Sequence, residues 1–446
     1  MSTRRTRTTH APLRRRALCA IAGALALMAA GCGYGTAISG SAGSPVCTPS
    51  DGPVRLTMWT WVPGIEKTIA VWNRAHPDVQ VDVVPTPADG LAEKLLNSVA
   101  AGQPPDLFQA GFQQVVAFRT QQAVQDIAEC PGVREVGSRF VPWTWQQVTG
   151  DGGVWAIPQD TGPTAMLYRK DLFEQYGIAV PRTWDDFAAA GERLRAASPE
   201  RTFVNIRKPD WFLTGLAWQA GARWFTQDGK AWTVGIDDPA TTRMADYWQD
   251  LIDSGTASAF KDDAWEQAAY RSGNLVTVLA PVWYLPILQS FAPETAGTWA
   301  AAPMPEWEPG VPRSANMGGS TSMVMRGTRH PAEAARFAVW LNTDPVALRM
   351  NADQAGLFPA SVEGQAAITA TPELAAFYGG QDVYQVYREA SEHVDPEFAW
   401  GPIQPNLRDA VQAVLSRGAP LREAFADANT RTVRDLQIQS QPVVTR

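Results

Sequence analysis

Aromatic and amide side chains follow several predicted strands of this chain, at the positions where a parallel α/β sheet places its ligand contacts. Trp61 ends the first predicted strand, and Phe112, Gln113 and Gln114 follow the third. An indole offers a flat apolar face, and a glutamine amide both donates and accepts hydrogen bonds. These groups suit non-covalent binding of a solute that has apolar C–H faces and a rim of hydroxyl groups.

Two further pairs of residues fit binding of the same kind of solute. Trp283 and Tyr284 follow an apolar strand predicted for residues 274–280. Gly318 and Gly319 carry no side chain, so their backbone amides can approach a ligand closely. The chain has 18 tryptophans in 446 residues, and most are expected in the core. Four are expected there because they fall on apolar faces of predicted helices: Trp72, Trp184, Trp248 and Trp340.

The acidic residues do not predict an enzyme. The clearest candidates for acid–base chemistry are three pairs of adjacent acids: Asp185–Asp186, Asp237–Asp238 and Asp262–Asp263. Neighbouring side chains point apart, whereas glycoside cleavage needs two carboxyl groups that face each other across a bond. Helix capping explains these acids better. With four histidines and no cysteine–histidine cluster, the sequence predicts no metal site and no cofactor.

The N-terminal residues have the order of an export signal. Residues 1–16 hold six arginines and no acid, and an apolar run of fourteen residues follows at 17–30. This run is too short to cross a bilayer and suits a signal peptide. Ala29-Ala30-Gly31-Cys32 resembles a bacterial lipobox, so we expect cleavage after residue 31 and lipid on Cys32. The protein is then extracytoplasmic and held at the cell membrane by that lipid alone. Sec and twin-arginine export both stay open.

Charge and cysteine content narrow the function further. Six of the 38 basic residues lie in residues 1–31 and none of the 45 acidic ones does, so the remainder carries a net charge of −13. That charge argues against nucleic acid as a partner. Cys47 and Cys130 remain in the exported part, where disulfides persist. They form either a bridge that pins the N-terminal tail or two buried thiols.

The rest of the chain is predicted to form two α/β lobes. Residues 32–53 are rich in Gly, Ser, Ala and Pro and read as a flexible tether. About 390 residues follow, too many for one ordinary core. Strand and helix patterns alternate between residues 54 and 110, which predicts a parallel, doubly wound sheet, and the alternation resumes after residue 165.

Six segments in a fixed order connect the chain to a known family. They are residues 154–187, Gln103–Leu107, Ala280–Trp283, Met317–Gly319, His330–Phe337 and Gly356–Pro359. In these segments, and from about Leu56 to Leu436, the chain resembles the extracellular solute-binding proteins of carbohydrate ABC importers, of the maltose-binding-protein-like type. One departure is that Gly273-Asn274-Leu275-Val276-Thr277 stands where the family often has Gly-Lys-Ala-Ala-Met, and Ala280 replaces a glycine.

The resemblance implies an α/β, two-lobed periplasmic-binding-protein-like fold. Each lobe is a doubly wound sheet flanked by helices, and the ligand cleft lies between the lobes. The implied lobes are residues 54–160 with 314–358, and residues 165–313 with 360–446.

The resemblance also implies particular ligand contacts. Asp160, Thr161 and Gly162 lie where the family's chain crosses between lobes, so they are expected to face ligand hydroxyls; a turn-forming role stays open for Asp160. Trp283 matches a stacking position, and Trp400 lies in a loop that the family brings to the cleft.

The implied function is that of a monomeric binding protein that captures a carbohydrate, of di- or oligosaccharide size, and delivers it to ABC permease subunits. Two alternatives stay open. One is binding of a glycerophosphodiester or another polar solute, for which Arg223 and Arg313 are the candidate phosphate contacts. The other is a lipid-anchored glycoside hydrolase.

Overall fold

The computed structural model describes residues 47–444 except residues 88–89, 208, 260 and 405–406. The predicted leader at residues 1–31, Cys32 and most of the predicted tether lie outside this part of the chain. Within it, no helix is both long enough and apolar enough to cross a membrane.

Five strands form the first sheet, in the order β2–β1–β3–β14–β6. Their bounds are Val79–Pro85, Val54–Thr60, Leu107–Gly111, Ser320–Val324 and Ile157–Asp160. β1 runs parallel to β2 and β3, as the alternating pattern predicts. β14 pairs antiparallel with both β3 and β6. The sheet is therefore mixed and not wholly parallel, because β14 alone runs opposite to the other four strands.

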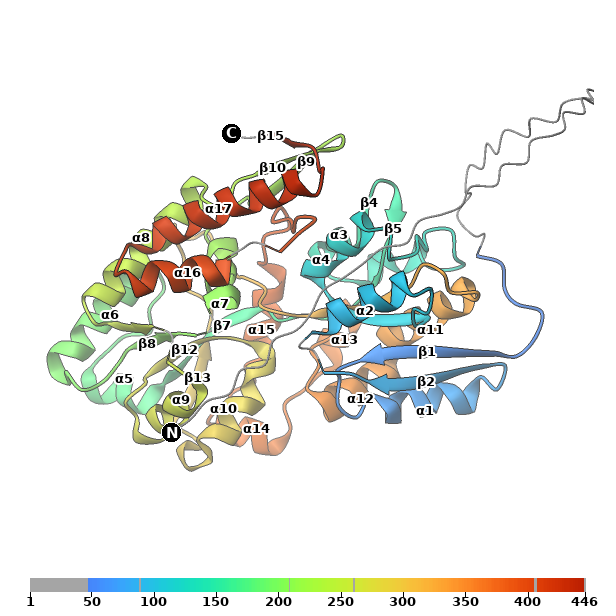
Figure 1. Cartoon of the computed structure of the whole chain (residues 1–446). Coiled ribbons are helices and arrows are strands. Elements are labelled where there is room, and N and C mark those ends of the chain that lie inside the picture. Colours follow the sequence, from blue (N-terminus) through green and yellow to red (C-terminus); the bar gives the residue numbers. More distant parts are fainter. Residues whose placement is uncertain (1–46, 88–89, 208, 260, 405–406, 445–446) are drawn as a thin grey trace, which may run out of the picture. The chain divides into compact units, whose positions relative to one another are not determined.

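Helices cover the first sheet with their apolar faces. α1 (Ile65–Ala75) buries Ile65, Ile69 and Trp72, which matches the predicted helical spacing. Figure 1 shows β1 and β2 side by side, with α1 and α12 below them. The other elements of this region are α2 (Leu91–Ala100), α3 (Phe112–Thr120), η1 (Glu135–Arg139), α4 (Pro142–Val148), β4 (Thr149–Gly150), β5 (Gly153–Val154), α11 (Pro331–Thr343) and α12 (Pro345–Ala355). α13 (Val362–Ala367) follows α12 and leads towards the second region.

The second sheet repeats the strand pattern of the first. β7 (Thr164–Arg169) pairs antiparallel with β12 (Thr277–Pro281) and with β13 (Trp299–Ala302). β8 (Val204–Ile206) runs parallel to β11 (Ala257–Ala259). The amide N–H of Thr277 donates to the carbonyl of Phe203 at 2.9 Å, which continues the parallel β11–β8 pair onto β12. In each sheet one strand, β14 or β7, therefore runs opposite to all the others and follows three parallel strands. The predicted α/β class is confirmed.

The helices of the second region begin and end where local signals predict. Thr183 caps α6 (Trp184–Ala197): its Oγ1 accepts from the Asp186 amide at 3.1 Å, and the Asp186 carboxylate accepts from the Thr183 amide at 3.0 Å. Gly177 ends α5 (Lys170–Tyr176) with a φ of 59°. Other helices here are α7 (Pro209–Gln219), α8 (Pro239–Asp253), α9 (Asp263–Ser272), η2 (Val282–Tyr284), α10 (Leu285–Phe291), η3 (Pro293–Thr295), α14 (Pro372–Phe377) and α15 (Val383–Glu392).

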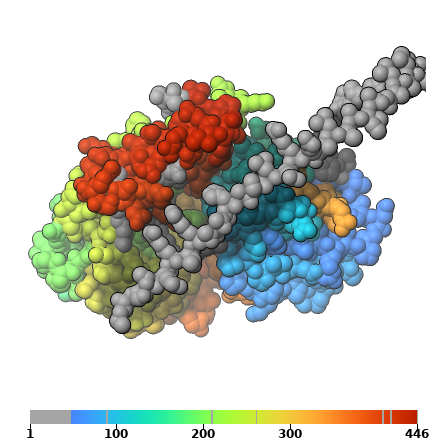
Figure 2. Space-filling view, viewed as in Figure 1, coloured from blue at the N-terminus to red at the C-terminus, as the bar shows by residue number. Residues whose placement is uncertain are grey.

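The C-terminal helices close the second region. α16 (Leu407–Ser416) and α17 (Leu421–Ile438), red in Figure 2, lie on the surface, and α17 packs against α8. A hairpin of β9 (Phe225–Asp228) and β10 (Ala231–Val234) pairs with the last strand, β15 (Val443–Val444).

The predicted core tryptophans are buried, with one exception. Trp72, Trp184 and Trp248 are almost wholly inaccessible. Trp340 packs on Trp72 with ring centroids 5.2 Å apart but stays partly exposed, because it lies at the edge of its apolar face on α11.

Three connecting segments link the two sheets: residues 160–164, 314–319 and 358–361. The backbone ties them together, because the Thr161 amide donates to the Phe358 carbonyl at 2.8 Å. The Gly162 amide donates to Asn316 Oδ1 at 2.7 Å. The first segment is therefore hydrogen-bonded to both of the others.

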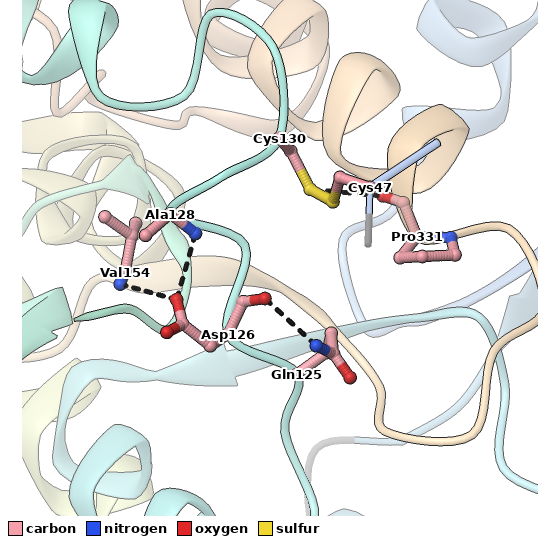
Figure 3. Close-up of a disulfide and its surroundings, with 7 residues drawn as sticks. All are labelled: Cys47, Gln125, Asp126, Ala128, Cys130, Val154 and Pro331. Atoms are coloured by element: carbon pink, nitrogen blue, oxygen red, sulfur yellow. Dashed lines mark hydrogen bonds between the residues drawn. A yellow bond between two sulfur atoms is a disulfide. The ribbon is translucent and has the colours of Figure 1, made fainter. Parts of the chain in front are cut away.

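The structure brings the two exported cysteines together. The sulfur atoms of Cys47 and Cys130 lie within bonding distance, and the Cα atoms are 4.9 Å apart (Figure 3). Cys130 Sγ also lies 3.8 Å from the Pro331 carbonyl oxygen, at the start of α11. Beside this pair, Asp126 Oδ1 accepts from the amides of Ala128 and Val154 and fixes the loop that carries Cys130.

Candidate binding site

A cavity of about 810 Å³ lies between side chains of the two sheets and the segments that connect them. From the first region its lining includes Trp61, Leu91, Gln109, Gln113, Gln114, Asp160 and Ser320. From the second region it includes Arg207, Trp211, Phe212, Asp263, Leu279, Trp283, Tyr284, Ile287 and Phe291, and Met317, Gly318 and Gly319 complete it. A volume of this size accommodates a ligand of several fused or linked rings.

A relay of hydrogen bonds forms the polar floor of the cavity. Thr60 Oγ1 donates to Gln109 Oε1 at 2.5 Å, and Gln109 Nε2 donates to Ser320 Oγ at 2.9 Å. The Ser320 hydroxyl in turn donates to Asp160 Oδ1. The strands β1, β3, β14 and β6 are neighbours in the sheet, so the relay runs across four strands and holds the Asp160 carboxyl in place.

The Asp160 carboxyl is 6% exposed, and no described arginine or lysine forms an ion pair with it. Burial raises the pKa of Asp160 to about 6, against the opposing effect of the hydrogen bond from Ser320. A carboxyl in this state can accept hydrogen bonds from ligand hydroxyls above that pH and donate one below it.

Two indoles form a corner around Gly318. Trp283 Nε1 donates to the Met317 carbonyl at 2.8 Å, which fixes the plane of its half-buried ring. Trp211, on α7, is 41% exposed although it lines the cavity. Gly318 has a φ of 92°, and a Cβ there would lie 3.0 Å from Trp283 Nε1 and 3.6 Å from Trp211 Cζ3. Only glycine fits between the two rings without displacing one of them.

A buried ion pair lies behind the aromatic wall. Arg207 Nε is 2.9 Å from Glu266 Oε2, and the Arg207 guanidinium lies over the Tyr284 ring, 3.9 Å from its centroid. Burial raises the pKa of Glu266, while the neighbouring Arg207 charge lowers it and leaves a smaller net rise. Burial also raises the pKa of the Tyr284 hydroxyl, so that side chain stays neutral.

The described residues contain no group of three or more His, Cys, Asp or Glu side chains arranged to hold a metal ion. The cavity thus offers flat aromatic faces, amides, a hydroxyl and carboxyls, a set that recognises polar organic solutes by stacking and hydrogen bonding.

Comparison with known proteins identifies the family. The model of the bacterial extracellular solute-binding protein family matches residues 60–347 of this chain. The chain belongs to this family. The match covers the whole predicted crossing at residues 154–187 and nearly all of the residues that line the cavity.

Individual relatives agree with this assignment. The arabinooligosaccharide-binding protein of Bacillus subtilis strain 168 is 24% identical over 302 residues, which are 64% of this chain and 68% of that protein. The lactose-binding protein of Rhizobium radiobacter is 24% identical over 422 residues, 89% of this chain and 96% of that one. A solved structure of the galacto-N-biose-/lacto-N-biose I-binding protein of the ABC transporter from Bifidobacterium longum, in complex with lacto-N-biose, has a TM-score of 0.78 at 26% identity and covers 89% of this chain and 100% of that one.

Most of the predicted contact residues of this solute-binding protein lie together. The cavity lining contains Trp61, Gln113, Gln114, Asp160, Trp283, Tyr284, Gly318 and Gly319. They come from the ends of β1, β3, β6 and β12 and from the segment before β14, as expected for a sheet that gathers its ligand contacts at the strand ends.

Four predicted contact residues lie outside that lining. Phe112 is buried against Trp143, with ring centroids 5.4 Å apart. Thr161 is buried, and its hydroxyl lies 3.4 Å from the Phe358 carbonyl. Gly162 has no room even for a Cβ, which would collide with the Met317 carbonyl. Phe112 thus packs in the core, and Thr161 and Gly162 are buried in the first connecting segment.

Trp400 is the fourth. Its ring packs edge-on against Phe398 and Trp218, at 5.3 and 6.3 Å between centroids, and it is not among the cavity-lining residues. The loop that carries it therefore contributes to an aromatic cluster beside α7. We omit Phe112, Thr161, Gly162 and Trp400 from the candidate site.

Sequence reasoning missed Gln109, Arg207, Trp211 and Ser320. Gln109 lies inside the otherwise apolar strand β3, where a polar residue is itself a signal because burying it requires a partner. Ser320 opens the mostly polar strand β14, which gives no such signal. Trp211 lies on α7, whose residues 212–219 are all buried, so the helix gives no periodic signal of its exposure. Arg207 precedes that helix, and only the fold brings it to Glu266.

Proposed function

We propose that this protein binds a di- or oligosaccharide in the cavity and delivers it to the permease of an ABC importer. The observation that carries the proposal is the pairing of three tryptophans, Trp61, Trp211 and Trp283, with the polar floor built on Gln109 and Asp160. Sugar rings present apolar faces to indoles and hydroxyls to amides and carboxyls, so both halves of the cavity have a partner on the ligand.

The relatives support the same ligand class. They are named for binding arabinooligosaccharides and lactose, and the solved relative holds lacto-N-biose. We propose two lobes, residues 54–160 with 314–358 and residues 165–313 with 360–446, that close on the ligand. The three hydrogen-bonded connecting segments support a hinge at this place. The protein acts as a monomer in this proposal.

The glycerophosphodiester alternative has less support. Its candidate cations, Arg223 and Arg313, both pair with Asp395, at 3.0 and 3.1 Å, and neither lines the cavity. The hydrolase alternative is also weaker. Asp238 and Asp262 accept from amides in the first turns of α8 and α9, which are capping contacts, and the relatives are binding proteins. We propose binding without a catalytic step.

Isothermal titration calorimetry against a panel of neutral and anionic solutes tests the function. The panel is lactose, lacto-N-biose, β-1,6-galactobiose, arabinobiose and glycerophosphocholine. We expect at least one disaccharide to bind with a Kd in the micromolar range or below, and mass spectrometry to recover it unchanged. Tighter binding of glycerophosphocholine than of every sugar, or release of monosaccharides, contradicts the proposal.

We also propose that lipid on Cys32 holds the protein at the membrane. The support is the basic and apolar leader that ends in Ala29-Ala30-Gly31-Cys32. Cys32→Ala is expected to leave the protein uncleaved or released from the membrane. Cell fractionation and intact mass measure this, and a variant that sediments with membranes at the parent's mature mass contradicts the lipobox.

A further inference from the structure

Charge in the cavity is arranged around a single cation. Arg207 is the only arginine or lysine among the described residues that line it. Its Nε lies 2.9 Å from Glu266 Oε2, and Asp263, one turn earlier on the same helix, also acts on its charge. The positive charge is therefore already balanced before any ligand enters.

Glu266 is held in that position on every side. It is 1% exposed, Asn205 Nδ2 donates to its Oε1 at 2.8 Å, and the Tyr284 hydroxyl lies 3.4 Å from its Oε2. The Tyr284 ring lies against the Arg207 guanidinium and limits its movement. Because Glu266 is buried and held in place, a ligand that draws Arg207 away leaves the Glu266 carboxylate without its charged partner, which is strongly unfavourable.

The other charged groups of the cavity are acids. Asp160 and Asp263 line it, and neither forms an ion pair with a described arginine or lysine. With Arg207 balanced by Glu266, the described lining carries net negative charge. An anionic group on a ligand would lose its hydration without gaining an available cation.

We infer that Glu266 makes this site selective for uncharged saccharides, by keeping Arg207 neutralised so that uronates and sugar phosphates are rejected. The inference rests on the proposed saccharide function. It adds that the ligand is uncharged and that Glu266 determines this preference. Glu266 is a positioning residue, since it acts through Arg207 and is itself shielded from the cavity.

The test compares matched pairs of ligands by calorimetry. Each disaccharide of the panel is paired with the same disaccharide in which one primary alcohol is oxidised to a carboxylate. We expect the parent protein to bind the acid about 100-fold more weakly than the neutral sugar, and Glu266→Gln to reduce this ratio to about tenfold or less, where tenfold corresponds to 1.4 kcal/mol. Raised salt should restore part of the ratio in the variant.

Control variants separate this effect from net charge and from misfolding. Glu294→Gln removes the same charge from an exposed ion pair with Arg271 and should leave the ratio unchanged. If Glu266→Gln does not fold, Asp263→Asn is used in its place, because Asp263 is exposed and its substitution should not disturb folding. This variant should reduce the ratio of neutral-sugar to acid affinity about threefold.

The outcomes are distinct. An acid that binds the parent as tightly as its neutral partner overturns the inference and leaves the saccharide function standing. The inference is also overturned if the ratio of neutral-sugar to acid affinity is the same in the parent and in Glu266→Gln. The same holds for Asp263→Asn where that variant is used. If no sugar of either kind binds, the proposed function fails and the inference fails with it.

Discussion

The two walls of the cavity come from sheets of the same strand pattern but carry different chemistry. The first region presents Gln109, Gln113 and Ser320, which are hydrogen-bonding groups, with one indole at Trp61. The second presents Trp211 and Trp283 with further aromatic rings. In both sheets three parallel strands are followed by one antiparallel strand and then by one that again runs with the first three. The order and direction of the strands therefore determine where the ligand-contacting residues lie. The residue types after each strand determine whether those contacts are stacking or hydrogen bonding.

The regions also differ in how they are held together. The first region places the cysteine pair Cys47–Cys130 against the start of α11. The second has no cysteine among its described residues and instead buries large aromatic side chains: Trp184, Trp218, Trp224, Trp248 and Trp299. A cross-link acts mainly on the unfolded chain, whereas aromatic packing acts on the folded one.

The largest expected effect concerns the cysteine pair. Peptide mapping of non-reduced protein by mass spectrometry should find Cys47 linked to Cys130. The two are 83 residues apart in sequence, and the entropic model gives a loss of on the order of 4 kcal/mol in the free energy of unfolding when such a bridge is removed. Cys130→Ser should show that loss in urea denaturation.

Reductant provides the control for this prediction. It should destabilise the parent by the same amount and leave Cys130→Ser unchanged. Two free thiols in protein isolated from the cell envelope would contradict the bridge and remove this difference between the regions.

The second prediction tests the aromatic wall. Trp283→Ala removes a stacking surface and the hydrogen bond to the Met317 carbonyl, and should weaken saccharide binding by about 2–4 kcal/mol, roughly thirty- to thousand-fold. Calorimetry measures affinity, and thermal unfolding measured on the same sample corrects for the folded fraction.

A buried tryptophan of the same region is the control for Trp283. Trp184 is buried in the core, and its Nε1 donates to Gln219 Oε1 at 3.1 Å. Trp184→Ala should lower stability by about 3–5 kcal/mol and leave the affinity of the folded fraction unchanged. Unchanged affinity in Trp283→Ala, with loss of binding in Trp184→Ala at equal folded fraction, would place the site elsewhere.

The third prediction tests the polar floor through its pH dependence. The pKa of Asp160 is raised from 3.8 in the unfolded chain to about 6 in the folded protein. The folded state therefore holds a proton that the unfolded chain has released, so stability falls as pH rises from about 4 to about 6 and stays lower above that. The loss is of order 3 kcal/mol at pH 7.

Asp160→Asn should remove this loss. Its stability should match the parent near pH 4 and exceed it by up to about 3 kcal/mol at pH 7, while saccharide affinity at pH 7 falls about tenfold because a charged acceptor is gone. Asp106→Asn is the control. Asp106 accepts from the Thr57 amide at 2.9 Å at the opposite end of β3, so its loss should reduce stability without changing affinity. A parent whose stability rises between pH 4 and 6 relative to Asp160→Asn would contradict the raised pKa.

The smallest expected effect belongs to Trp211. Because this side chain is 41% exposed, Trp211→Ala should change the free energy of unfolding by less than about 0.5 kcal/mol. Its loss from the cavity should still weaken saccharide binding by about 1 kcal/mol, or roughly fivefold. Equal affinity of variant and parent in calorimetry would confine the aromatic wall to Trp283 and its neighbours.

The sequence by itself determined the local elements and the fold class. Thr183 with Asp186 marks the start of α6, Gly177 ends α5, and the apolar spacing of α1 puts Trp72 inside, because capping and periodicity depend only on nearby residues. It also predicted Trp61 at the cavity, because a residue at the end of a sheet strand lies at the ligand edge. The family resemblance, together with the strand end for Trp283, predicted Asp160 and Trp283 there.

Only the tertiary structure decided which neighbours these residues meet. Thr161 and Gly162 adjoin Asp160 in sequence, yet they are buried against the two other connecting segments, Thr161 at Phe358 and Gly162 at Met317. Arg207 and Glu266 are 59 positions apart and become an ion pair through the packing of α9 beside β8. Contacts between residues far apart in the chain depend on how whole helices and strands pack together. The spacing of residues within one element does not predict that packing.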